Sequence, residues 1–205
     1  PAEELKIDRS FIRDMLDDPE DLAILEATLG LARSFHRSVV AEGVESEEHG
    51  IQLLQLGCEV AQGFFISKPI PAEHIPQWLN EWLPPQSWLT QTPLPQCIYP
   101  LLYTSAEHRA WMSRYKDYLH GELQQFPELT SADSFHNWRL STEADDRHSQ
   151  NIAIMVEELF EQINQLITKK DPEAQDTSEI EEQLELLNNA LLTAMKQLIQ
   201  PIHPH

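Results

Sequence analysis

Five closely spaced prolines divide this 205-residue chain into two parts. They are Pro84, Pro85, Pro93, Pro95 and Pro100, with glutamine and threonine between them. Proline fixes its own φ angle and has no amide hydrogen, so we expect no helix or strand to run through residues 83–100. We therefore predict two domains, residues 1–82 and residues 106–200, joined by a proline-rich linker over residues 83–105.

Residues 1–82 alternate short β-branched or apolar runs with amphipathic helical stretches. This alternation is typical of parallel β/α units, so we predict an α/β fold for the first domain. The expected strands cover residues 5–8, 38–42 and 58–66. The expected helices begin near Asp18, at Ser46 and near Ile75. The first of these helices places Leu22, Leu25, Leu29 and Ala32 on one face.

From Ala106 onward the pattern is helical throughout, which predicts an all-α second domain. One helix is expected near residues 106–120 and another at residues 179–199. Between them, a third helix carries apolar residues at heptad spacing: Ile152, Val156, Leu159, Ile163 and Leu166. Helices with apolar stripes of this kind bury them against one another, so a small helical bundle follows.

The charge balance narrows the possible partners. The 34 acidic and 14 basic residues give a formal net charge of -20, which repels phosphate backbones and anionic membrane surfaces. We therefore expect no nucleic-acid duplex and no membrane contact among its partners. Cys58 and Cys97 are too few for a disulfide framework, which favours a reducing bacterial cytoplasm as the location.

Polar residues stand at the ends of the expected strands: Lys6, Asp8, Glu42 and Gln62. In barrels of parallel β/α units, ligands bind at this carboxyl edge of the strands. A lysine between Leu5 and Ile7 is expensive to bury without a negative partner. A buried carboxylate beside a lysine suits either an internal ion pair or a catalytic site, and the residues alone leave both readings open.

Three segments resemble, in order and spacing, the C-terminal third of EAL domains. They are residues 5–12 (LKIDRSFI), residues 39–45 (VVAEGVE) and residues 56–71, which contain Gln62-Gly63-Phe64-Phe65. The resemblance implies a TIM-barrel-like fold, of which this chain would supply the sixth, seventh and eighth strands. It also implies hydrolysis of cyclic-di-GMP to linear pGpG with two Mg²⁺ or Mn²⁺ ions.

Carried over by this resemblance, Lys6 corresponds to the lysine that holds the attacking water and neighbouring phosphate charge. Glu42 corresponds to the carboxylate that ligates the second metal, and Gln62 to the glutamine that supports the same water. The Glu-Ala-Leu strand and the family's other acidic ligands are absent, so we expect an incomplete barrel that is inactive alone. With Pro1 in place of an initiating methionine, this favours a piece of a longer protein.

The helical part resembles the chemoreceptor zinc-binding domain, in which three histidines and a cysteine hold zinc. His108 and His148 match two of the histidines, while Asp133 stands where the family has cysteine and Ile152 replaces the third histidine. Asp133 or His136 could complete a zinc site with the two matching histidines. The alternative is a degenerate bundle that retains its packing tryptophans and serves for interaction or dimerisation.

Three hypotheses follow. The leading one is a metal-dependent cyclic-di-GMP phosphodiesterase, active as a longer, homodimeric protein, with the bundle sensing a signal or positioning the catalytic domain. The second is a non-catalytic cyclic-di-GMP receptor. The third gives the helical part an independent role as a zinc-responsive or dimerisation module.

Overall fold

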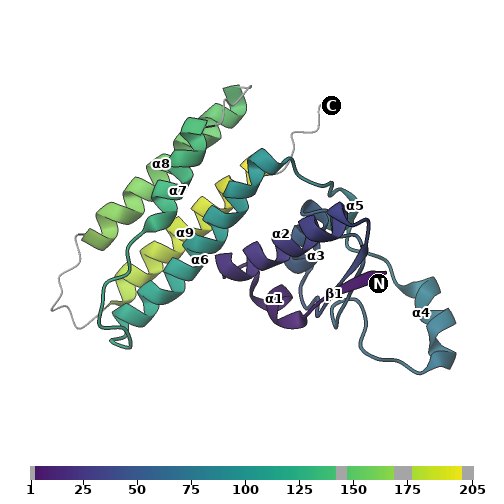
Figure 1. Ribbon diagram of the computed structural model, residues 1–205. Coiled ribbons are helices and arrows are strands. Elements are labelled where there is room, and N and C mark those ends of the chain that lie inside the picture. Colours follow the sequence, from purple (N-terminus) through teal and green to yellow (C-terminus); the bar gives the residue numbers. More distant parts are fainter. Residues whose placement is uncertain (1–2, 142–146, 169–176, 200–205) are drawn as a thin grey trace. The chain divides into compact units, whose positions relative to one another are not determined.

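The computed structural model describes residues 3–141, 147–168 and 177–199 (Figure 1). The chain divides into two compact units, Pro1–Pro95 and Gln96–His205. The boundary between them falls inside the predicted linker. In the described part of the chain, no helix combines the length and apolar character needed to cross a membrane.

The first unit contains a parallel three-stranded sheet in the order β1-β2-β3. Strand β1 covers Glu4–Ile7, β2 covers Ser38–Glu42 and β3 covers only Ala61–Gln62. The first two strands confirm the sequence prediction, but the third is much shorter than the expected 58–66. The reason is a turn directly after Gln62, in which the Gly63 carbonyl accepts hydrogen bonds from the amides of Ile66 and Ser67. The described residues thus form β/α units without a closed barrel.

Helices α1 (Arg9–Asp14), α2 (Pro19–Ser34) and α3 (Glu47–Gln55) follow the strands and begin at side-chain caps. The predicted cap of α2 is confirmed, because the Asp18 carboxylate accepts from the Glu20 amide and Pro19 opens the helix. All four predicted apolar positions of α2 are buried. Helix α1 was not predicted; Asp8 caps it by accepting from the Ser10 amide. Helix α4 (Ile75–Glu81) lies where the third helix was expected.

A short helix inside the predicted linker, α5 (Gln86–Leu89), belongs to the first unit. The indole of Trp88 lies over α3, where its Nε1 donates to the Glu47 carbonyl at 2.9 Å. A Cβ at Gly50 would come within 2.1 Å of the Trp88 ring, so glycine is what permits this approach. The prolines did not prevent a helix here because Pro85 precedes α5 at its N-cap and interrupts no helical hydrogen bond.

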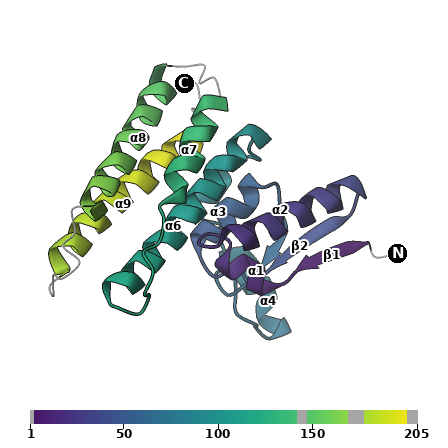
Figure 2. The same cartoon turned by 60° about the vertical axis from the view of Figure 1, so that its left-hand side comes forward.

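The second unit is a bundle of α6 (Tyr99–Leu119), α7 (Thr130–Ser141), α8 (Arg147–Thr168) and α9 (Ser178–Ile199). Figure 2 shows α8 beside α9 and α6 beside α7, and α6–α9 and α7–α8 contacts complete the bundle. Helix α6 begins seven residues before the predicted start at 106. Its Pro100 lies in the first turn, where a missing amide hydrogen costs nothing. The core includes Tyr115, Phe135, Val156, Ile163, Leu184 and Leu191.

Candidate functional site at the carboxyl edge of the sheet

The strand register brings the three sequence-predicted residues of the first unit together. Glu42 lies opposite Gln62 at the ends of β2 and β3, and Lys6 reaches them from β1. The Lys6 Nζ donates to Glu42 Oε1 at 2.9 Å. The Gln62 Nε2 donates to the same oxygen at 3.2 Å. One carboxylate oxygen therefore accepts hydrogen bonds from an ammonium group and from an amide. Both contacts lie at the carboxyl edge of the strands, which is where barrels of parallel β/α units bind ligands.

The exposure of this cluster differs from the expectation of a buried pair. The side chain of Lys6 is 60% exposed and that of Glu42 is 29% exposed. Exposed ion pairs of this kind contribute little to the stability of a protein, so stability gives little reason for the contact. The hydrogen bond and charge of Glu42 raise the pKa of Lys6, which keeps the ammonium protonated at neutral pH and above.

The backbone after Glu42 is anchored to the third strand. The amides of Gly43 and Val44 both donate to the Gln62 carbonyl, at 2.8 and 3.1 Å. Gly43 has a φ of 87°, and a Cβ there would lie 2.4 Å from the Cβ of Arg9 in α1. The missing side chain at position 43 therefore lets helix α1, which follows β1, come close to the backbone after Glu42.

The cluster by itself does not fit a two-metal centre. Magnesium prefers six oxygen ligands in near-octahedral geometry. The three residues offer one carboxylate, and the Lys6 ammonium already occupies one of its oxygens. Residues 3–141, 147–168 and 177–199 contain no group of three or more His, Cys, Asp or Glu side chains placed to hold a metal ion. Any such centre would need acidic ligands from outside these residues.

Comparison with known proteins agrees with this geometry. The model of the EAL domain family matches residues 1–69, which include all three strands and the Lys6–Glu42–Gln62 cluster. Residues 1–69 are an EAL-domain fragment.

Curated relatives of the EAL-domain fragment are bacterial. The chain is 45% identical over 84 residues to the oxygen sensor protein DosP of Escherichia coli K12, which is 41% of this chain and 10% of that protein. It is 47% identical over 75 residues to the bifunctional diguanylate cyclase/cyclic di-GMP phosphodiesterase MucR of Pseudomonas aeruginosa, which is 37% of this chain and 11% of MucR. It is 38% identical over 74 residues to the cyclic di-GMP phosphodiesterase RocR of the same species, 36% of this chain and 19% of RocR. The chain thus spans a fifth or less of the length of these relatives.

Among the side chains that the structure describes, the residues predicted to bind zinc in the second unit do not come together as a metal site. His108 is fully buried in α6, with its Nδ1 3.3 Å from Ser131 Oγ. His136 is exposed on α7, where its Nδ1 lies 3.2 Å from Glu157 Oε1, and Asp133 is exposed one turn earlier. The side chain of His148 lies outside the described residues. The resemblance to a zinc-binding domain is not confirmed, and zinc binding stays a prediction.

His108 is instead a packed histidine. Its ring stacks on Trp111 at 5.6 Å between centroids and meets the edge of Phe160 at 5.5 Å. Burial lowers its pKa to about 4, partly offset by the side chain of Asn188, so the ring is neutral at pH 7. The tryptophans predicted to pack the bundle do so, and Trp111 and Trp138 are both buried.

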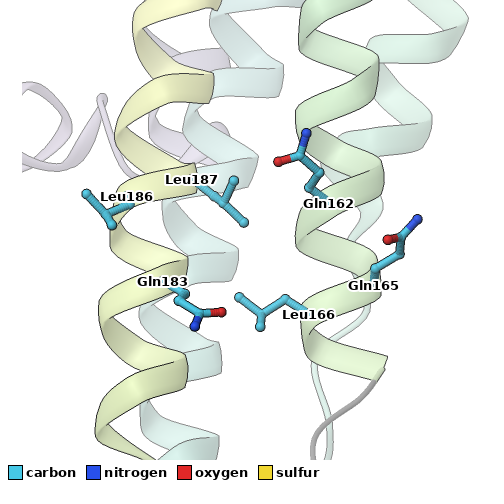
Figure 3. Close-up of a pocket in the computed structure, with 6 residues that line it drawn as sticks. All are labelled: Gln162, Gln165, Leu166, Gln183, Leu186 and Leu187. Atoms are coloured by element: carbon cyan, nitrogen blue, oxygen red, sulfur yellow. The ribbon is translucent and has the colours of Figure 1, made fainter.

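A groove on the helical unit was not predicted from the sequence. It has a volume of about 460 Å³ and lies between α8 and α9 (Figure 3). It is lined by Gln162, Gln165, Leu166, Gln183, Leu186 and Leu187. The heptad pattern predicted that Leu166 would be buried together with Ile152, Val156 and Ile163. The last three are buried, whereas Leu166 is only half-buried and lines this groove.

Proposed function

We propose that this chain contributes Lys6, Glu42 and Gln62 to the active site of a cyclic-di-GMP phosphodiesterase, in a longer protein whose remaining EAL strands complete the barrel. The observation that carries the proposal is the convergence of Lys6 and Gln62 on one oxygen of Glu42 at the carboxyl edge of the sheet. The similarity to MucR and RocR supports it, since the names of both proteins include cyclic di-GMP phosphodiesterase.

Each of the three side chains suits one part of phosphodiester hydrolysis. The Lys6 ammonium stabilises negative charge that develops on the phosphoryl oxygens as water attacks phosphorus. The Gln62 amide orients the attacking water. The Glu42 carboxylate takes a hydrogen bond or a proton from that water, or binds a divalent cation once acidic ligands from the rest of the domain are present. The water oxygen forms a new bond to phosphorus and one ester P–O bond breaks. The ribose oxygen that leaves takes up a proton and becomes a hydroxyl group, so linear pGpG results.

Hydrolysis of cyclic-di-GMP by the full-length protein with Mg²⁺ or Mn²⁺ tests the proposal. We expect wild type to release pGpG and Glu42→Gln to release none, since the amide can neither take a proton nor bind a cation well. Glu59→Gln is the matched control, because Glu59 is an exposed carboxylate just before β3, outside the cluster. Binding of cyclic-di-GMP by wild type without any pGpG would make the protein a receptor and reject the enzyme.

For the helical unit, we propose a role in sensing, interaction or homodimer formation within the longer cytoplasmic protein. Its packed aromatic core and the groove between α8 and α9 support a stable module with a face available to a partner. A metal assay and a melting curve with and without a chelator test whether this unit senses or binds zinc. A melting temperature that the chelator leaves unchanged would reject it.

A further inference from the structure

His49 is a buried imidazole in the first turn of α3, and it bonds to the chain segment that follows Glu42. Its Nδ1 accepts a hydrogen bond from the Glu45 amide at 3.3 Å. Its own backbone amide donates to Ser46 Oγ, the N-cap of α3, at 3.1 Å. This pairing resembles a capping box, in which the side chain at the third helical position reaches back to an amide at the helix start.

Burial lowers the pKa of His49, and the nearby backbone of Arg13 in α1 only partly offsets this effect. The ring is therefore neutral at pH 7, which leaves Nδ1 as an acceptor for the Glu45 amide.

The segment that His49 holds follows the candidate catalytic carboxylate in sequence. Glu45 stands three residues after Glu42. The amides of Gly43 and Val44 are held by the Gln62 carbonyl, whereas the Glu45 amide is held by His49.

We propose that His49 is a positioning residue for the candidate active site. By accepting a hydrogen bond from the Glu45 amide, its buried ring fixes the segment after Glu42, and so helps to hold the Glu42 carboxylate at its 2.9 Å contact with Lys6. His49 acts through this segment and does not touch the substrate. Only the kinetic test of this inference rests on the proposed hydrolase function.

The kinetic test compares His49→Leu, His49→Gln and Gln55→Leu in the full-length protein. We expect His49→Leu to lower kcat for cyclic-di-GMP by about 10- to 100-fold with KM nearly unchanged, because misplacement by about 1 Å costs on that order. His49→Gln restores most of the activity, since its side-chain oxygen can accept from the Glu45 amide. Gln55→Leu is the control: Gln55 is buried on the same helix, but its amide donates to Gln91 Oε1, away from the segment.

Amide hydrogen exchange at residues 43–45, measured without substrate, gives a readout independent of catalysis. Exchange should be about tenfold faster in His49→Leu than in wild type, and unchanged in His49→Gln and Gln55→Leu. Equal kcat losses in His49→Leu and Gln55→Leu, or unchanged exchange in all variants, would overturn the proposal. If wild type shows no hydrolysis, the proposed function fails, and the exchange rates alone decide whether His49 holds the segment.

Discussion

Gly43 has a backbone conformation that side chains rarely adopt, directly after the candidate catalytic carboxylate. We expect Gly43→Ala to destabilise the first unit by about 1–3 kcal/mol, because its φ of 87° is strained for alanine and the new methyl would meet Arg9. Gly30→Ala is the control, since Gly30 lies inside α2 with open space around it. There alanine should stabilise by about 0.5–1 kcal/mol. Urea unfolding of both variants measures the difference, and equal stabilities would contradict the argument.

The buried ring of His108 makes the helical unit sensitive to acid. Below pH 6.5 the unfolded chain binds a proton at His108, whereas the folded ring stays neutral down to about 4. The free energy of unfolding of the helical unit therefore has its full value at pH 7. It falls by up to about 3 kcal/mol as the pH drops from 6.5 to about 4.

Unfolding of wild type and His108→Gln at pH 7 and pH 4.5 checks this dependence. The carboxylates contribute equally to both proteins, so the variant should lose less stability between the two pH values. A loss as large as that of wild type would show that His108 takes up its proton in the folded state as readily as in the unfolded chain.

At the level of single residues, the sequence identifies a candidate site residue when its position within a strand or helix indicates its role. Lys6 and Glu42 could be found because each stands at or near the end of an expected strand. Gln62 was also a candidate, although the expected strand 58–66 continues past it. His49 could not be found, because its ring bonds to the backbone amide of Glu45, and a backbone amide carries no residue-specific signal. The burial of His108 and the exposure of His136 likewise depend on which helix faces pack together.

Among the elements, the contact between α3 and α5 extends the first unit past its predicted end. We expect Trp88→Ala to destabilise this unit by about 2 kcal/mol, because it removes the indole that covers Gly50 and donates to Glu47. It should also make residues 83–95 more susceptible to limited proteolysis. Leu89→Ala, on the same helix but 63% exposed, should change neither. Similar effects of the two substitutions would show that α5 does not pack as described.

Element length explains which parts of the fold were predictable. Helix α2 has sixteen residues, a cap and a regular apolar face, so its period is clear in the sequence. Helix α1 has six residues and α5 has four, too few to display a period. Strand β3 stops at Gln62 although apolar residues continue to Ile66, because a turn takes the backbone hydrogen bonds that a longer strand would need.

For the molecule as a whole, each compact unit has buried apolar residues of its own, so we expect each unit to respond to its own mutations. Leu53 is buried in the first unit and Val156 in the second. Truncation of either to alanine should cost about 2–4 kcal/mol in its own unit only. Hydrogen exchange resolved by unit measures this, and faster exchange in both units from one substitution would indicate a single cooperative structure.

The prolines predicted the division of the chain but not the residue at which one unit gives way to the other. That point depends on Trp88 and Leu94, which the first unit holds through Glu47 and Gln55. Proline spacing restricts local backbone conformation and carries no information about such tertiary contacts.

Gln62 makes hydrogen bonds with both its side chain and its backbone. Its side-chain amide donates to Glu42, while its backbone carbonyl accepts from the amides of Gly43 and Val44. Replacement by alanine removes the first contact and leaves the second, because every residue has the same carbonyl. Alanine at position 62 therefore tests the role of the side chain with little change to the backbone. Any substitution at Gly43, in contrast, changes the backbone conformation together with the position of the neighbouring carboxylate.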